Sequence, residues 1–360
     1  MLLQDVFINR KKELSTIPSG LRMGQSYILI APRRYGKTTL MKKIAGIIAD
    51  QNTIVVYVDI MRYANDLNNL TEAIVEACLN KIGFLGKIQN WVKSVNLKLD
   101  IKVKFHELEI DAIIEELKQK DNYTALAKAV DLPEKLSEKY NKRFIMFYDE
   151  FGELQHFNEH AVKVMRSMIQ HHKHVSYLFA GSQESLMNKI FISNKGAFYR
   201  FGIIYQLAEL ETKDVIEFFH TNLTNVDTEV FEYIIENFKG HPYYTTNLFF
   251  RISQFAQAFP TAKFSLADLK TMITDLIFSE SHYLSDQIKK LTSRRHELEV
   301  IIAVSDGNPY TTKSALTKQT VYACLKNLLK DGFLLKRNEN YVLADPLLAT
   351  YLKDESLSLI

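Results

Sequence analysis

The stretch YILIAPRRYGKTTL, residues 27–40, decides the fold of this chain. Its first four residues, Tyr27–Ile30, form an apolar run that predicts a short buried strand, and the pattern after Lys37 predicts an amphipathic helix. The segment between them matches the phosphate-binding pattern G-x-x-x-x-G-K-[ST], except that Ala31 replaces the first glycine. In such a loop, backbone N–H groups surround phosphates at the N-terminus of the following helix. We therefore expect a site for ATP or another purine nucleoside triphosphate.

The pattern assigns a role to each residue of this loop. Lys37 is expected to reach the β- and γ-phosphates, and the hydroxyl of Thr38 is expected to ligate Mg²⁺. The methyl group of Ala31 is compatible with such a loop if the residue has a negative φ. The residues expected to contact nucleotide are Ala31, Pro32, Arg33, Arg34, Tyr35, Gly36, Lys37, Thr38 and Thr39.

A second motif follows the apolar run Arg143–Tyr148 (RFIMFY). Asp149 at its end is expected to hold Mg²⁺ through the water shell of the ion, and Glu150 is expected to orient and activate the attacking water. A kinase that transfers phosphate to a small acceptor does not need a water-polarising carboxylate at this place. The pair therefore favours hydrolysis.

Further apolar runs at Thr53–Val58, Ser176–Ala180 and Ile203–Leu207, separated by helix-length segments, predict an α/β fold with a parallel sheet. Ligands gather at the carboxyl ends of such strands. Ser182, after the fourth run, is interpreted either as a sensor of the γ-phosphate, alone or with Gln183, or as a turn serine. Arg200, before the fifth run, is interpreted either as an arginine finger, in cis or toward a neighbouring subunit, or as a surface arginine.

The rest of the chain predicts further domains. We expect a P-loop ATPase domain over residues 1–210, with an insertion at about residues 65–140, and an all-helical domain over 211–290. In residues 291–360, three helices followed by a hairpin outline a winged helix-turn-helix, with a short helix expected around Lys313–Leu316. Alternation over Leu97–Phe105 indicates either an edge strand or a protruding hairpin.

The bulk composition excludes some classes of protein. The 360 residues carry a net charge of only +3, so any argument for a nucleic-acid partner must be local. The two cysteines, Cys78 and Cys324, lie in apolar helical patterns and are expected to be reduced thiols. The sequence has neither a signal peptide nor an apolar run of membrane-spanning length. We expect a cytoplasmic protein with no membrane partner.

The ordered motifs resemble those of the archaeal-type ATPases in the STAND branch of the AAA+-like P-loop proteins. The resemblance departs from the family at Ala31, at Gly152, where Gln is frequent, and at Tyr199, where Gly is usual. It rests on FINRKKEL (7–14), APRRYGKTTL (31–40), FIMFYDEFGEL (144–154), LFAGS (178–182), AFYRFG (197–202) and GHPY (240–243).

The resemblance implies an ATP/ADP-dependent switch built from an ATPase domain, a helical lid and a winged helix. It also implies that Pro242 lies against the base or ribose and that Asn9 and Arg10 help to hold the adenine side. The leading hypothesis is an ATP-hydrolysing switch, and the departures at Ala31 and beside Arg200 indicate slow turnover.

Two rival hypotheses remain open. The first is an ATP-gated DNA-binding protein that resembles initiator or origin-recognition ATPases, because residues 293–353 hold three more basic than acidic residues. Its DNA-facing side chains would include Lys318, Lys326 and Arg337. The second is a protein-interaction module that binds a protein partner or a second copy through Leu97–Phe105, with nucleotide only stabilising the fold.

Overall fold

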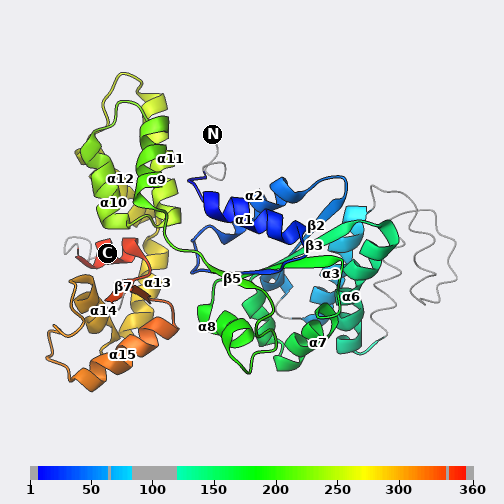
Figure 1. The fold of residues 1–360 in the computed structure, drawn as a ribbon. Helices are drawn as coiled ribbons and strands as arrows, with labels where there is room; N and C mark the ends of the chain where they lie inside the picture. Colours follow the sequence, from blue (N-terminus) through cyan, green and yellow to red (C-terminus); the bar gives the residue numbers. More distant parts are fainter. Residues whose placement is uncertain (1–6, 64–65, 83–119, 338–339, 354–360) are drawn as a thin grey trace. The chain divides into compact units, whose positions relative to one another are not determined.

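The computed structural model describes residues 7–63, 66–82, 120–337 and 340–353. The chain divides into two compact units (Figure 1). One unit comprises Lys11–Leu207, and the other comprises Ala208–Ile360 together with Met1–Arg10. The division of the second unit into a lid and a winged helix stays a prediction.

A five-stranded parallel sheet organises the first unit, as the sequence predicts. Its order is β2-β3-β4-β1-β5, so β1 is flanked by β4 and β5. Each observed strand agrees with its expected bounds to within about one residue at either end. The strands are β1 (Tyr27–Ile30), β2 (Thr53–Asp59), β3 (Arg143–Asp149), β4 (Val175–Gly181) and β5 (Ile203–Gln206).

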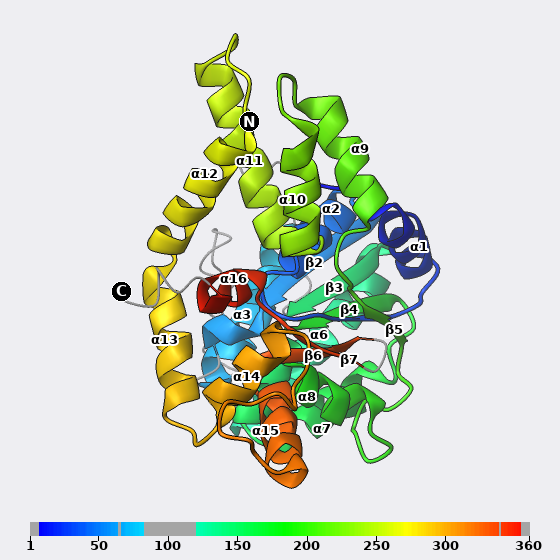
Figure 2. The same ribbon diagram turned by 90° about the vertical axis from the view of Figure 1, so that its left-hand side faces the viewer.

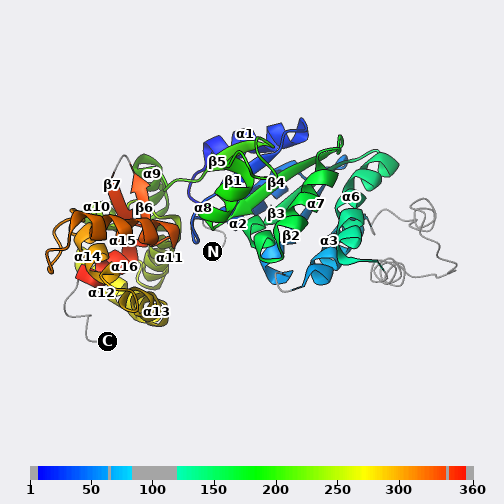
Figure 3. The same cartoon turned by 90° about the horizontal axis from the view of Figure 1, so that it is seen from below.

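Helices cover both faces of this sheet (Figures 1 and 3). Figure 1 shows α1 and α2 on one face and α7 and α8 on the other. The helices are α1 (Lys11–Arg22), α2 (Lys37–Ile48), α3 (Leu67–Ile82), α6 (Asn122–Tyr140), α7 (Glu159–Ile169) and α8 (Glu184–Met187), with short turns of 3-10 helix at Ile60–Tyr63 and Phe151–His156 and a π-helical turn at Asn188–Ile192.

Alternating side chains of the central strands explain this layered arrangement. In β3, Phe144, Met146 and Tyr148 enter one continuous core with residues of α3, α6 and α7. Their neighbours Ile145 and Phe147 are also fully buried, so both faces of the strand are covered. A strand of this kind requires helices on both sides of the sheet, which accounts for its nearly uninterrupted apolar sequence.

Helices α9 to α13 begin the second unit (Figure 2). The turn before α11 depends on Gly240, which has φ 71°, and a Cβ at this position would lie 2.2 Å from the carbonyl oxygen of Leu210. Only glycine can both adopt this positive φ without strain and leave room for the carbonyl oxygen of Leu210. The helices are α9 (Thr212–Asn222), α10 (Thr228–Phe238), α11 (Pro242–Ala258), α12 (Leu266–Ser279) and α13 (Ser281–Thr292).

The last part of the second unit contains helices and a hairpin. The short helix expected around Lys313–Leu316 is wrong, because these residues form a turn. Ala315 has φ 47°, a left-handed conformation that cannot continue a right-handed helix. The elements are α14 (Glu297–Ser305), α15 (Lys318–Lys330), the antiparallel strands β6 (Leu334–Arg337) and β7 (Asn340–Leu343), and α16 (Pro346–Lys353).

Two further expectations from the sequence concern the alternating segment Leu97–Phe105 and membrane-spanning helices. The alternating segment Leu97–Phe105 lies outside the described residues, so its role stays a prediction. Among the helices that the structure describes, none has the length and apolar character needed to cross a membrane.

Candidate functional site

The phosphate loop joins the carboxyl end of β1 to the amino end of α2. Gly36 precedes α2 with φ 79°, and no side chain caps the first turn of the helix. The first turn also contains no acidic residue. The initial N–H groups of α2 therefore have no intrahelical acceptor and no capping oxygen, which makes this helix end suited to an anion.

Ala31 fits the entry of the loop without strain. It is fully buried, its N–H donates to the carbonyl oxygen of Gly181 at 3.4 Å, and it is absent from the residues with positive φ. The left-handed conformation is adopted further along, at Arg34 (φ 68°) and Gly36. The substitution of alanine for glycine at position 31 is therefore compatible with the turn.

The ammonium group of Lys37 lies folded back against its own loop. Its Nζ donates to the carbonyl oxygens of Ala31 at 2.9 Å and Pro32 at 3.1 Å, and it lies 3.9 Å from Oε1 of Glu150. Burial lowers the pKa of Lys37, against the opposing effect of the carboxylates of Glu150 and Asp149. The lysine is thus a nearly buried cation, held by acceptors that a phosphate can replace.

Asp149 meets the phosphate loop at the end of β3. Its Oδ2 accepts hydrogen bonds from the hydroxyl of Thr38 at 2.8 Å and from that of Tyr57 at 2.5 Å. Its Oδ1 accepts from the backbone N–H of Glu150 at 3.0 Å. The structure therefore brings together the two residues that the sequence predicts as metal ligands.

Glu150 contacts the end of β4. Its Oε2 accepts hydrogen bonds from the backbone N–H of Ser182 at 2.9 Å and from its hydroxyl at 2.7 Å. Glu150 itself has φ 49°, a conformation that costs free energy in a non-glycine residue. Strain of this kind is frequent at functional sites, and here it directs the carboxylate toward Ser182.

The oxygen atoms in this region suit a hard divalent cation. The hydroxyl of Thr38 and the carboxylate of Asp149 are in direct contact, and Asp59 ends β2 directly beside Asp149 in the sheet register. Burial, followed by the charge of Asp149, raises the pKa of Asp59, as expected where carboxylates gather. Mg²⁺ prefers oxygen ligands of this type, so the donor set fits the ion.

Arg200 lies away from these residues. Ile203 pairs with Tyr27 and Gln206 pairs with Ile30, so Arg200 precedes the amino end of β5, whereas the phosphate loop follows the carboxyl end of β1. The two edges are separated by four strand residues, or about 13 Å. The guanidinium of Arg200 instead lies 5.2 Å from the centre of the Tyr199 ring. The structure therefore does not bring Arg200 to the phosphate loop of its own chain, which argues against the cis interpretation.

The residues expected on the adenine side belong to the second unit. Pro242 is buried at the first position of α11. Arg10 has φ 116°, and its guanidinium donates to the carbonyl oxygen of Ala208 at 2.8 Å. Asn9 precedes it, and its side chain accepts from the N–H of Arg10 at 2.9 Å. Their roles toward a purine stay predictions.

Sequence reasoning missed Tyr57. A tyrosine in a β-branched run is typical of a strand, so the residue carried no functional signal of its own. The available signal was the alternation of side chains in β2, which places Tyr57 and Asp59 on the same face.

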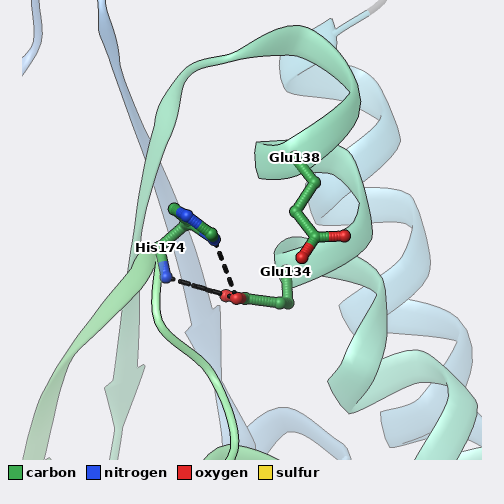
Figure 4. Close-up of side chains that lie close together, drawn as sticks. All are labelled: Glu134, Glu138 and His174. Carbon is green, nitrogen blue, oxygen red and sulfur yellow. Dashed lines mark hydrogen bonds and ion pairs between the residues drawn. The ribbon is translucent and has the colours of Figure 1, made fainter.

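A separate cluster of carboxylates and a histidine lies on the α6 side of the first unit (Figure 4). Glu134 accepts hydrogen bonds from the backbone N–H groups of Lys173 at 2.8 Å and His174 at 3.1 Å, and it contacts Nδ1 of His174 at 3.0 Å. Glu138, one turn further along α6, is exposed. These bonds explain the buried Glu134 as an anchor for the turn before β4.

The parallel sheet, the uncapped loop before α2 and the carboxylates at the same edge define a P-loop nucleoside triphosphatase fold. The chain belongs to the family of ATPase domains found predominantly in Archaea, whose sequence pattern matches residues 7–248.

Solved structures support the fold. A Walker-type ATPase of Pyrococcus abyssi superimposes with a TM-score of 0.66 at 16% identity, covering 98% of this chain and 100% of that one. The ORC2 protein of Aeropyrum pernix, solved as ADPNP–ADP complexes, superimposes with a TM-score of 0.59 at 13% identity, covering 96% of this chain and 92% of that one. No protein with curated annotation matches the chain significantly.

Proposed function

We propose that this chain is a slow ATP-hydrolysing conformational switch of the STAND/AAA+-like type. The observation that carries the proposal is the contact of Glu150 with Ser182 beside the ammonium group of Lys37. Glu150, the proposed water-activating carboxylate, thus contacts both Ser182, the proposed γ-phosphate sensor, and Lys37, the proposed phosphate-binding lysine. That arrangement suits a site in which the arrival of the third phosphate rearranges all three groups.

Each residue has a defined task in this proposal. ATP phosphates replace the carbonyl oxygens of Ala31 and Pro32 as acceptors for Lys37, and they receive the open N–H groups at the start of α2. Thr38 and Asp149 hold Mg²⁺, which neutralises charge on the phosphates when it is bound. Glu150 accepts the proton of the attacking water, and Ser182 donates its hydroxyl hydrogen to the γ-phosphate.

The switch part of the proposal rests on the order of the motifs and on the two compact units of the chain. The nucleotide complexes of the Aeropyrum ORC2 protein, which has a similar fold, favour ATP and ADP as the two nucleotides. Hydrolysis would then change the contacts made by Ser182 and Glu150 at the end of β4.

A Glu150→Gln substitution tests the catalytic part. We expect ATP and ADP binding to persist, because the amide keeps the shape of the side chain, and turnover to fall by about 10²–10⁴-fold, because the general base is lost. Glu153→Gln is the matched control, since Glu153 lies one turn further on and bonds Gln183. Turnover in Glu150→Gln equal to that of the wild type would refute the mechanism.

A second candidate function is ATP-gated binding of duplex DNA through a winged helix in residues 291–360. The observation that favours it is the outer face of α15, where Lys318, Tyr322 and Lys326 are exposed. Two other polar residues of this region already contact protein groups. Asn327 donates to Glu297 at 3.2 Å, and Arg337 pairs with Glu209 at 2.9 Å.

Duplex binding at several salt concentrations tests this candidate. Neutralising Lys318 and Lys326 removes two phosphate contacts, so affinity is expected to fall and the salt dependence to become shallower. Lys313→Gln is a control in the loop before α15. Binding that is absent at low salt would remove the candidate and leave the ATPase proposal intact.

A further inference from the structure

Tyr57 provides a hydrogen bond to the acidic residue of the proposed metal site. It lies in β2, at the edge of the sheet, and its hydroxyl donates to Oδ2 of Asp149 at 2.5 Å. Alternation along β2 sends Val56 and Val58 into the core that contains α3 and α6, so Tyr57 lies on the opposite face. Tyr57 is 36% exposed, so burial in the core does not account for its position.

The carboxylate of Asp149 is fixed at both oxygen atoms. Oδ1 accepts from the N–H of Glu150, while Oδ2 accepts from both Thr38 and Tyr57. When the hydroxyl oxygen of Thr38 ligates a cation through a lone pair, its hydrogen can still be donated to Asp149. Tyr57 is the second side-chain donor to Oδ2, and its hydroxyl comes from a different element of the fold.

We infer that Tyr57 is a positioning residue that orients Asp149 for the magnesium ion of the nucleotide. The inference rests on the proposed function, because it requires Asp149 to hold that ion. Hydrogen-bond partners of metal-ligating carboxylates typically contribute about 10–100-fold to metal affinity. Tyr57 is placed to make this contribution from a strand that contains no residue of the phosphate loop.

The protonation state of Tyr57 is consistent with this role. Burial, followed by the hydrogen bond to Asp149 and its charge, raises the pKa of the phenol above its ordinary value of 10.0. The hydroxyl therefore stays a donor throughout the pH range in which an ATPase is assayed. Asp59, on the same face, is the charged residue of β2 near this site, and its Oδ2 lies 3.3 Å from Nε of Arg62.

The experiment compares wild-type protein with Tyr57→Phe in binding ADP. Fluorescent ADP is titrated in EDTA and at a series of Mg²⁺ concentrations, and Mn²⁺ bound to the ADP complex is measured by electron paramagnetic resonance. We expect the affinity for Mn²⁺ and Mg²⁺ to fall by about 10–100-fold in Tyr57→Phe. Metal-free ADP affinity is expected to stay unchanged, because the phosphate loop is intact.

Tyr148→Phe is the matched control. Tyr148 immediately precedes Asp149, but its side chain enters the core on the other face, and its hydroxyl has no hydrogen-bond partner among the described residues. We expect this variant to bind metal and ADP like the wild type. A thermal midpoint for each variant shows that both fold.

The outcomes separate this inference from the function on which it rests. Equal metal affinity in Tyr57→Phe and wild type overturns the positioning role alone. An equal loss of ADP affinity in EDTA and in Mg²⁺ also overturns it, because the tyrosine would then support the loop rather than the ion. Wild-type protein whose ADP affinity is independent of metal contradicts the proposed magnesium site itself.

Discussion

Oε2 of Glu150 accepts two hydrogen bonds from Ser182, one from the backbone N–H at 2.9 Å and one from the hydroxyl at 2.7 Å. A carboxylate oxygen bound in this way is less available to accept a proton from water. The hydroxyl of Ser182 has a single hydrogen to donate, so it cannot bond Glu150 and a γ-phosphate at the same time. If Ser182 senses the γ-phosphate as proposed, ATP binding requires its hydroxyl to leave Glu150.

Ser182→Ala tests this exchange. We expect the variant to keep the ADP affinity of the wild type, because ADP lacks the phosphate that Ser182 is proposed to contact. Its ATP affinity is expected to fall about tenfold, since a hydrogen bond to a charged group contributes about 1.5–3 kcal/mol. Competition of ATP and ADP against a fluorescent ADP measures both affinities.

The control for this substitution is Ser185→Ala, which removes an exposed hydroxyl from α8 three residues away. Both nucleotide affinities are expected to be unchanged in it. A loss of ADP and ATP affinity in equal proportion in Ser182→Ala would show that the serine supports the loop instead of distinguishing the nucleotides.

Gly36→Ala is expected to weaken nucleotide binding through backbone strain alone. Gly36 has φ 79°, and a Cβ at this position meets no atom within 4 Å, so the substitution creates no clash. The left-handed conformation costs a residue with a Cβ about 1–2 kcal/mol. The loop relaxes away from this conformation, and nucleotide must restore it, which lowers affinity by up to about thirtyfold.

Gly46→Ala, within α2, is the control, because alanine is expected to have the opposite effect there. Gly46 lies in the exposed part of α2, and a Cβ there also meets no atom within 4 Å. Alanine is expected to stabilise the helix by about 0.5–1 kcal/mol and to leave ADP affinity unchanged. Thermal midpoints with and without ADP check both variants. A Gly36→Ala protein with full ADP affinity would contradict the strain argument.

The sequence predicted the meeting of Thr38 and Asp149 because both residues follow apolar runs of one parallel sheet. Strand direction alone then places both at the same edge. The contact of Tyr57 with Asp149 depends instead on which strand neighbours β3, and the order β2-β3-β4-β1-β5 cannot be read from apolar runs. Side-chain contacts across neighbouring strands therefore required the structure.

Arg200 shows a different limit of prediction from the sequence. It precedes an apolar run, whereas Thr38, Asp149 and Ser182 follow such runs, and in a parallel sheet this difference separates the two edges. The turn at Lys313–Leu316 was missed for a local reason. The carbonyl oxygen of Thr312 accepts from the N–H of Ala315 and its hydroxyl accepts from that of Leu316, which closes the chain into a turn.

Arg200→Ala is expected to leave the ATP affinity of the dilute chain unchanged, because Arg200 lies at the edge of the sheet opposite the phosphate loop. An effect on turnover would then require a second copy of the chain, and it would grow with protein concentration. Turnover measured over a wide range of concentrations checks this expectation. A fall in turnover that is the same at all concentrations would contradict it.

Asp131 is expected to make stability depend on pH in the acidic range. Its Oδ1 lies 3.4 Å from Nε2 of His172, and its Oδ2 lies 2.9 Å from Nζ of Lys135. The contact with His172 and then the contact with Lys135 lower the pKa of Asp131 from 3.8 to about 2, against the opposing effect of burial.

Since the pKa of Asp131 is lower in the folded chain, its contribution to stability is complete above pH 3.8 and is lost as the pH falls toward 2. Asp131→Asn is therefore expected to lower the free energy of unfolding at pH 7, and its difference from the wild type is expected to shrink as the pH falls through this window. Urea unfolding at pH 7, 5 and 3 measures the difference. Glu138→Gln, on the same helix and exposed, is the control. A difference that stays constant from pH 7 to pH 3 would mean that the carboxylate charge contributes nothing, and that Asp131 acts only through its shape.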